Sequence, residues 1–204
     1  YYGTHGMKDF AFVNLGYGIG AGIIANGKPL LGFNGISGEF GHTKLYPEAY
    51  TSRTCVCGKS NCLECFASGR GIEQTAKERI KNHPDSLVNE LTHNNTDLID
   101  ARLLAKAAGE GDSFALGIFL EAAEILGISI ANMTNILNPE AVILGGKVTR
   151  TGNFFISRIR EVFNREQLVH TNVPVKLMQT SIPGKTAVKG ATALVLREVL
   201  NLNA

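Results

Sequence analysis

TCVCGKSNCLEC, residues 54–65, contains all four cysteines of this 204-residue chain. Zinc takes four thiolate or imidazole ligands in a tetrahedron, and closely spaced cysteines on a turn supply them. Cys55, Cys57 and Cys62 can place three thiolates on one tight loop, and Gly58 lets the chain turn back. Clustered cysteines in a reducing compartment indicate a metal before a disulfide. We therefore expect a structural zinc site, the alternative being a set of ordinary buried thiols.

The fourth zinc ligand has two candidates. Spacing favours Cys65, because Cys62-x-x-Cys65 is a common arrangement of two zinc ligands. His42 lies upstream of the cysteines, at a separation that a folded chain can close. The residues alone leave this choice open.

A second group of chemically versatile side chains surrounds the cysteines. GEFGH, residues 38–42, places Glu39 and His42 three positions apart between glycines, which let the backbone approach a ligand closely. Glu64 stands between two cysteines, so a metal in this loop would fix its position. Carboxylates accept strong, charge-assisted hydrogen bonds, so these residues suit the hydroxyls of a polyol. The competing interpretation is two surface acids and a packing histidine.

Two glycine-rich stretches are weaker signals for a phosphate. GYGIGAG, residues 16–22, follows a predicted strand and can expose backbone N–H groups. The predicted pattern has no helix after it, which excludes the dinucleotide fingerprint and the P-loop. Gly145-Gly146 ends another predicted strand and is either a nucleotide-facing strand end or a tight turn. A bulged hairpin explains the first stretch equally well.

Hydrophobic spacing along the chain predicts one α/β domain with an inserted loop. Asn26-Gly27 indicates a hairpin turn, with residues 16–22 as a glycine-rich shoulder before it. The polar segment 82–99 is predicted to be irregular and receives no role. The expected strands are 10–15, the two arms of that hairpin, a short one near 46, 141–146 and 173–179. The expected helices are 68–81, 100–109, 113–137, 152–164 and 186–200, with 113–137 apolar most of the way round and therefore central.

Composition narrows the classes of protein. The net charge is +2 and the charged fraction is 19%, so the basic footprint of a nucleic-acid surface is absent. The sequence suggests no apolar run near the roughly 20 residues that span a bilayer, so we expect no membrane partner. Without a recognisable signal peptide, the expected compartment is the cytoplasm.

Taken together, these motifs resemble one family. LGYGIGAGIIANGK (15–28), GEFGHT (38–43), CVCGKSNCLE (55–64) and ASG (67–69) are similar to the ROK family of bacterial sugar kinases and sugar-responsive repressors. NPEAVILGG (138–146) and AVKGAT (187–192) also match its pattern. The resemblance implies an actin-like ATPase, RNase H-like fold with two lobes. Residues 1–204 would form its larger C-terminal lobe, with a zinc loop at about 42–65.

The resemblance also implies a role for each motif, and it makes His42 rather than Cys65 the fourth zinc ligand. The implied zinc ligands are His42, Cys55, Cys57 and Cys62. The implied sugar ligands are Glu39, His42 and Glu64, and the nucleotide-binding glycines, if that site is retained, are Gly18, Gly20, Gly22, Gly145 and Gly146. Family members commonly associate, so a homodimer or tetramer is expected.

The chain departs from the family pattern in two respects. A ROK kinase needs a phosphate-binding Asp-x-Gly-x-Thr and an Asn-Asp pair that holds the catalytic base, and none of the five aspartates lies in either motif. We expect the N-terminal lobe and any helix-turn-helix to lie outside this chain, which would then hold no catalytic residue and contact DNA only through that absent domain. Tyr17 stands where kinases usually carry threonine.

Tyr17, together with the intact sugar-site motifs, favours the lobe of a transcriptional regulator, or repressor, that binds a sugar or sugar phosphate. The alternative is an ATP-dependent hexose kinase, similar to glucokinases or N-acetylhexosamine kinases, which would also need Mg²⁺.

Overall fold

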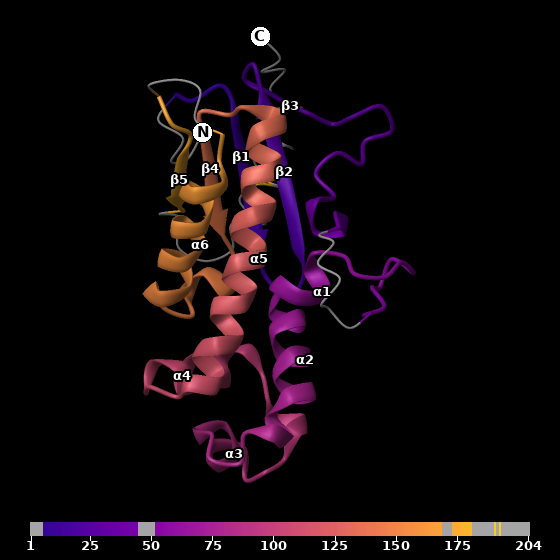
Figure 1. The fold of residues 1–204 in the computed structure, drawn as a ribbon. Helices are drawn as coiled ribbons and strands as arrows, with labels where there is room; N and C mark the ends of the chain where they lie inside the picture. Colours follow the sequence, from indigo (N-terminus) through magenta and orange to yellow (C-terminus); the bar gives the residue numbers. More distant parts are fainter. Residues whose placement is uncertain (1–5, 45–51, 169–172, 181–189, 191, 193–204) are drawn as a thin grey trace.

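A mixed five-stranded sheet forms the centre of the protein (Figure 1). The computed structural model describes residues 6–44, 52–168, 173–180, 190 and 192. Within them the strand order is β3-β2-β1-β4-β5. The strands are β1 (Phe10–Leu15), β2 (Ile19–Ala25), β3 (Lys28–Pro29), β4 (Ala141–Gly145) and β5 (Lys176–Gln179).

The sheet combines a hairpin with a parallel half. β1 and β2 pair antiparallel, and a turn at Asn26-Gly27, with positive φ at both residues, carries the chain from β2 into β3. β4 pairs parallel with both β1 and β5. All five residues of β4 are buried, as expected for a parallel strand covered on both faces. The carboxyl ends of β1 and β4 therefore lie at one edge of the sheet, where α/β proteins commonly bind ligands.

Helices cover the sheet and extend beyond its lower end in Figure 1. α5 and α6 run along one face of the sheet, while α2, α3 and α4 form a layer below it in this view. The helices are α1 (Glu64–Ala67), α2 (Gly69–Arg79), α3 (Leu87–Thr92), α4 (Ala101–Gly109), α5 (Ser113–Leu137) and α6 (Asn153–Glu166). Short 3₁₀ turns occupy Phe40–His42, Ile80–Asn82, Thr96–Leu98 and Val148–Arg150.

α5 is the central helix that its apolar sequence predicts. Its N-terminus is capped by Asp112, whose side chain accepts a hydrogen bond from the N–H of Ala115, and it ends at Asn138 in the left-handed conformation. By length and composition alone α5 is able to cross a membrane, so the expectation that no such stretch exists was wrong. Of its most apolar 18-residue window, 67% is buried inside the fold, as a core helix requires.

Several boundaries differ from those that the sequence predicts. The glycine-rich shoulder is partly strand, because β2 begins at Ile19 and includes Gly20 and Gly22. The cysteine segment is not all loop, since α1 starts at Glu64. Segment 82–99 is not irregular throughout but contains α3. The strand expected near residue 46 lies mostly outside the described residues, and Lys44 just before it forms an isolated bridge with Cys62. β5 begins three residues later than predicted, and helix 186–200 lies outside the described residues.

Close packing of α5 on α6 depends on Gly127. A Cβ at this position would lie 2.6 Å from the Cβ of Val162. We expect Gly127→Ala to lower the free energy of unfolding by about 1–3 kcal/mol, as overpacking does. Gly117→Ala in the same helix is the control, because a Cβ there meets nothing within 4 Å and should stabilise the helix by about 0.5–1 kcal/mol. Urea unfolding of both variants measures this, and equal effects would contradict the close approach of the helices.

Candidate functional site

The GEFGH segment lies directly against β2. The N–H of Ala21 donates to the carbonyl oxygen of Gly38 at 2.9 Å. A Cβ at Gly38 would lie 2.0 Å from the carbonyl oxygen of Ala21, and one at Gly41 would lie 2.2 Å from that of Ile19. No side chain fits at either position. The two glycines thus bring the 3₁₀ turn that ends at His42 onto the sheet.

The cysteine loop is fastened to α1 and α2 by a buried arginine. Arg53 is 4% exposed, and its Nη1 donates to the carbonyl oxygen of Cys65 at 2.9 Å and to Thr75 Oγ1 at 2.8 Å. It also forms an ion pair with Glu78 and lies 5.0 Å above the ring of Phe66. Sequence reasoning missed Arg53, because one arginine before a cysteine pair carries no recognisable pattern. Its contacts fix the start of the loop relative to two helices.

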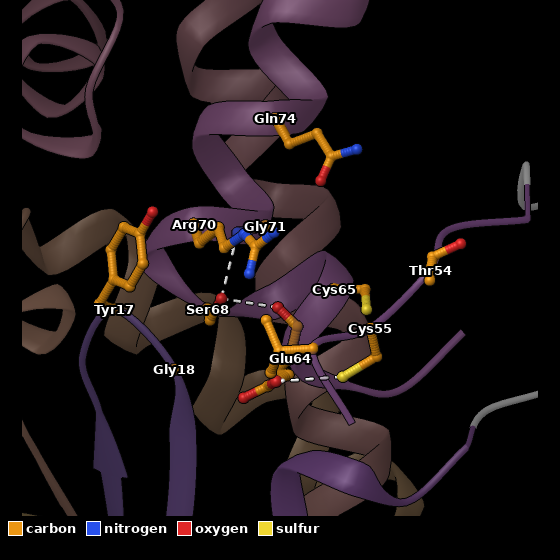
Figure 2. Close-up of a pocket in the computed structure, with 11 residues that line it drawn as sticks. Tyr17, Gly18, Thr54, Cys55, Glu64, Cys65, Ser68, Arg70, Gly71 and Gln74 are labelled. Atoms are coloured by element: carbon orange, nitrogen blue, oxygen red, sulfur yellow. Dashed lines mark hydrogen bonds between the residues drawn. The ribbon is translucent and has the colours of Figure 1, made fainter. Parts of the chain in front are cut away.

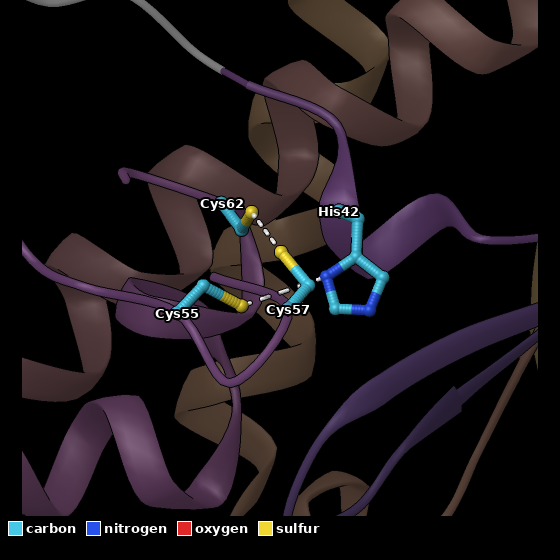
Figure 3. A group of neighbouring side chains, drawn as sticks. All are labelled: His42, Cys55, Cys57 and Cys62. Carbon is cyan, nitrogen blue, oxygen red and sulfur yellow. Dashed lines mark hydrogen bonds between the residues drawn. The ribbon is translucent and has the colours of Figure 1, made fainter. Parts of the chain in front are cut away.

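His42 and three cysteines converge at this loop (Figure 3). The ligand atoms of His42, Cys55, Cys57 and Cys62 all lie within 4.8 Å of one another. His42 Nδ1 is 3.6 Å from Cys55 Sγ, and the sulfurs of Cys57 and Cys62 are also 3.6 Å apart. With Zn–S of about 2.3 Å and Zn–N of about 2.0–2.1 Å, a tetrahedral site has S···S edges of about 3.8 Å and S···N edges of about 3.6 Å. The donor set and these two separations therefore fit zinc, and the other separations, all within 4.8 Å, keep the four donors close enough to surround one ion.

Cys65 does not belong to this group. It lies in α1, is buried, and its N–H donates to the carbonyl oxygen of Cys62. The structure thus brings His42 to the three other thiols, as the family resemblance implies. The preference for Cys65 that spacing alone suggests is not followed, because the helix that begins at Glu64 carries Cys65 away from the loop.

The thiols differ in their ease of ionisation. Burial raises the pKa of the Cys55 thiol far above its ordinary value, and burial also raises the pKa of Cys62. A hydrogen bond from the backbone N–H of Lys59 lowers the pKa of Cys57, which is exposed. A cation held by these sulfurs would reverse the effect of burial, because a coordinated thiol is deprotonated. Metal binding is then expected to release protons.

Two carboxylates flank the cluster. Glu64 Oε1 accepts a hydrogen bond from the Cys55 thiol at 3.2 Å and lies 3.9 Å from His42 Nδ1. Glu39 Oε2 is 3.5 Å from His42 Nε2, on the opposite side of the ring. The side chain of Glu39 is 63% exposed and that of Glu64 is 16% exposed. The three residues that the sequence suggests for a polyol therefore do meet, and one nitrogen of His42 faces the thiols while the other faces Glu39.

A small cavity lies beside Glu64 (Figure 2). Its volume is about 140 Å³, and it lies between the β1–β2 turn, the cysteine loop and the start of α2. Its lining residues are Tyr17, Gly18, Thr54, Cys55, Val56, Glu64, Cys65, Ser68, Arg70, Gly71 and Gln74. Glu64 and Cys55 are thus shared between the cavity and the metal-ligand cluster. Sequence reasoning missed Arg70 and Gln74, because their place at the cavity depends on where α2 begins.

The glycines suggested for a nucleotide are only partly brought together. Gly18 lies beside Glu64, since a Cβ there would be 2.9 Å from Oε2. Gly145 pairs with Asn14, so Gly145 and Gly146 end their strand at the same sheet edge as β1. Gly20 and Gly22 lie inside β2, with Gly22 opposite Phe12 and farther from that edge. Gly146 also has φ +100, and a Cβ there would lie 2.3 Å from the carbonyl oxygen of Leu15, so packing alone requires it.

The fold and site define an actin-like ATPase-type protein with a candidate metal centre. Its fold matches the crystal structure of a ROK family glucokinase from Streptomyces griseus in complex with glucose and AMPPNP, with a TM-score of 0.82 and 31% identity over 93% of this chain and 61% of that one. The ROK family model matches residues 2–198, and the chain belongs to the ROK family.

Sequence relatives fall in both functional branches. A glucokinase of Halalkalibacterium halodurans is 39% identical over 78% of this chain and 47% of its own length. A xylose repressor of Caldicellulosiruptor bescii is 33% identical over 96% of this chain and 48% of its own length. The chain thus spans about half the length of these curated relatives, which include a kinase and a repressor.

Substitution of single cysteines tests the metal centre. We expect Cys57→Ser to reduce bound zinc from about one ion per chain to a small fraction of that, because a structural site needs all four ligands. Cys65→Ser is the matched control and should retain zinc, since Cys65 lies outside the cluster. Elemental analysis of the purified variants measures the metal. Retention of zinc by the first variant and its loss from the second would reverse the assignment.

Proposed function

We propose that this chain is the sugar-binding lobe of a ROK-type transcriptional regulator, and that its effector is a sugar or sugar phosphate held beside a structural zinc. Glu39, His42 and Glu64 would contact the hydroxyls of the sugar. Zinc held by His42, Cys55, Cys57 and Cys62 would fix the loop that carries these groups. The DNA-binding domain and the second lobe would belong to other parts of a longer protein, in keeping with the half-length matches to relatives.

The observation that carries this proposal is the position of the His42 imidazole between the thiol cluster and Glu39, with Glu64 beside Cys55 on the cluster side. With Nδ1 toward Cys55 and Nε2 toward Glu39, a metal-bound His42 keeps its second nitrogen as an N–H donor. Each carboxylate accepts hydrogen bonds, so the three groups together offer both donors and acceptors to a ring of hydroxyls. A metal that orients the binding groups without contacting the ligand suits a sensor.

Tyr17 favours the regulator over the kinase. It lies in the turn between β1 and β2 and is 70% exposed. By the family resemblance, kinases usually carry at this place a threonine whose hydroxyl contacts a phosphate of ATP. A phenol ring is bulkier and its hydroxyl lies farther from the backbone. In a regulator, sugar binding would favour one conformation of the two lobes, and this requires the sugar to bind that state more tightly.

The alternative is that the chain is the same lobe of an ATP-dependent hexose kinase. Its 39% identity to a glucokinase supports this. Gly18 and the glycines at the end of β4 would then face ATP and Mg²⁺, and the catalytic base would come from outside this chain. Both functions share the sugar site.

Operator binding of the natural full-length protein separates the two functions. The regulator predicts that at least one sugar or sugar phosphate changes its affinity for operator DNA, measured by fluorescence anisotropy over a panel that includes xylose, glucose, N-acetylglucosamine and their phosphates. The kinase predicts sugar-dependent ADP release from ATP. Steady ADP production without any effect of sugar on DNA binding would favour the kinase.

Glu64→Gln tests the sugar site in either case. We expect the variant to retain zinc, because Glu64 is not in the cluster, and to bind its sugar about 10-fold or more weakly, since a charged acceptor becomes a neutral one. Calorimetric titration together with metal analysis measures both quantities. Glu140→Gln is a charge-matched control at the opposite end of β1, where Glu140 accepts hydrogen bonds from the N–H groups of Lys8 and Asp9. Normal sugar affinity in the Glu64 variant would exclude Glu64 from the site.

A further inference from the structure

Arg70 is a cation without a counter-charge at the edge of the cavity described above. Among the residues that the structure describes, its guanidinium forms no ion pair and no hydrogen bond, although its side chain lines the cavity. Among the described residues, Arg53 pairs with Glu78 and Arg79 with Glu121, whereas Arg70 lacks such a partner, as does Arg160 on the surface of α6. An unpaired guanidinium beside a cavity offers five N–H donors to an incoming anion.

Further donors surround the same cavity. Tyr17, Thr54 and Gln74 each contribute a hydroxyl or amide, and Figure 2 draws them with Arg70 around one space, although they come from three separate segments. The backbone N–H groups at the start of α2 are already engaged: those of Gly69 and Arg70 donate to the carbonyl oxygens of Gly16 and Tyr17, and that of Gly71 to the Ser68 side chain. The side chains, and not the helix end, are thus the available donors.

Glu64 limits which anions suit the cavity. It is the one carboxylate among the lining residues, and its carboxylate would repel a bare anion such as inorganic phosphate. A molecule with hydroxyls at one end and an anionic group at the other satisfies both charges, because Glu64 accepts from hydroxyls while Arg70 donates to the anion. The volume of about 140 Å³ is below the roughly 300–1,000 Å³ of sites that enclose a whole small ligand, so it suits one substituent.

We propose that this cavity binds the phosphate group of a phosphorylated sugar, with Arg70 and Tyr17 as its principal donors. The inference rests on the proposed function, because the sugar ring is placed at Glu39, His42 and Glu64. It narrows the effector from sugars in general to sugar phosphates. It also gives Tyr17 a positive role, as a phenol hydroxyl that reaches a phosphate carried by the sugar itself.

Paired titrations of the full-length protein test this. The ligands are N-acetylglucosamine, glucose, xylose and the monophosphate of each. Binding of each ligand is measured by isothermal titration calorimetry. For at least one pair, we expect the phosphorylated form to bind at least 10-fold more tightly. Arg70→Gln should remove that preference and leave affinity for the free sugar within about 2-fold, and Tyr17→Phe should reduce the preference in part. Arg160→Gln, which removes an exposed arginine of α6 outside the cavity, is the charge-matched control and should change nothing.

The outcomes separate this inference from the function on which it rests. Binding of free sugars with no preference for their phosphates, or a preference that survives Arg70→Gln, overturns the phosphate site and leaves the sugar-binding function intact. Failure of all sugars to bind overturns both. A phosphate could also belong to ATP, so titration with AMPPNP and Mg²⁺ is the further comparison. AMPPNP binding that is lost in Arg70→Gln, without any preference for sugar phosphates, assigns the cavity to a nucleotide and overturns the inference.

Discussion

The imidazole of His42 connects the candidate metal centre with the candidate sugar site. Its Nδ1 faces Cys55 at 3.6 Å and its Nε2 faces Glu39 at 3.5 Å, on opposite sides of one rigid ring. Because the ring is planar and rigid, fixing the position of Nδ1 also fixes the direction of the Nε2–H bond. The geometry of the metal-ligand cluster therefore determines where the Nε2 donor points. The ring can occupy this place only because glycines at 38 and 41 let its segment approach β2 more closely than any side chain permits.

The cysteine loop has two different anchors, and they act on different parts of it. Arg53 joins the start of the loop to α1 and α2 through buried polar contacts that need no metal. Cys57 is exposed at the loop tip, where burial supplies little stabilisation. A metal would therefore contribute mainly to the position of the tip and of His42. The attachment of Cys55 and Glu64 to the helices is provided by packing, since Cys55 is 5% exposed and Glu64 begins α1.

Sequence patterns predicted the parts of this structure that repeat a simple period. α5 follows the predicted bounds of 113–137 because its apolar residues nearly surround it. The patterns failed where a long-range contact decides the outcome. Gly20 and Gly22 have poor strand propensity, yet pairing with β1 makes them strand residues. The short helix α3 lies in a polar stretch and is fixed by its Ser86 cap and by the N–H of Leu87 donating to Asp112. The positions of Arg53 and Arg70 at the site follow from the placement of α2, which contains Arg70 and contacts Arg53 through Thr75.

The difference between a sensor and a kinase is expected to depend on the residues of the cavity beside Glu64. In the proposed site, Glu39, His42 and Glu64 would bind hydroxyls in a regulator and in a kinase alike, so these three residues do not distinguish the two functions. Tyr17 and Arg70 lie beyond Glu64, where a kinase would bring a phosphate to the sugar and a sensor would receive a phosphate that the sugar already carries. Phosphate transfer by a kinase and binding of a sugar phosphate by a sensor would both place a phosphate next to the hydroxyl-binding site, so the same lobe is compatible with either function. The side chains that line the cavity would then determine whether that phosphate is transferred to the sugar or only bound as part of it.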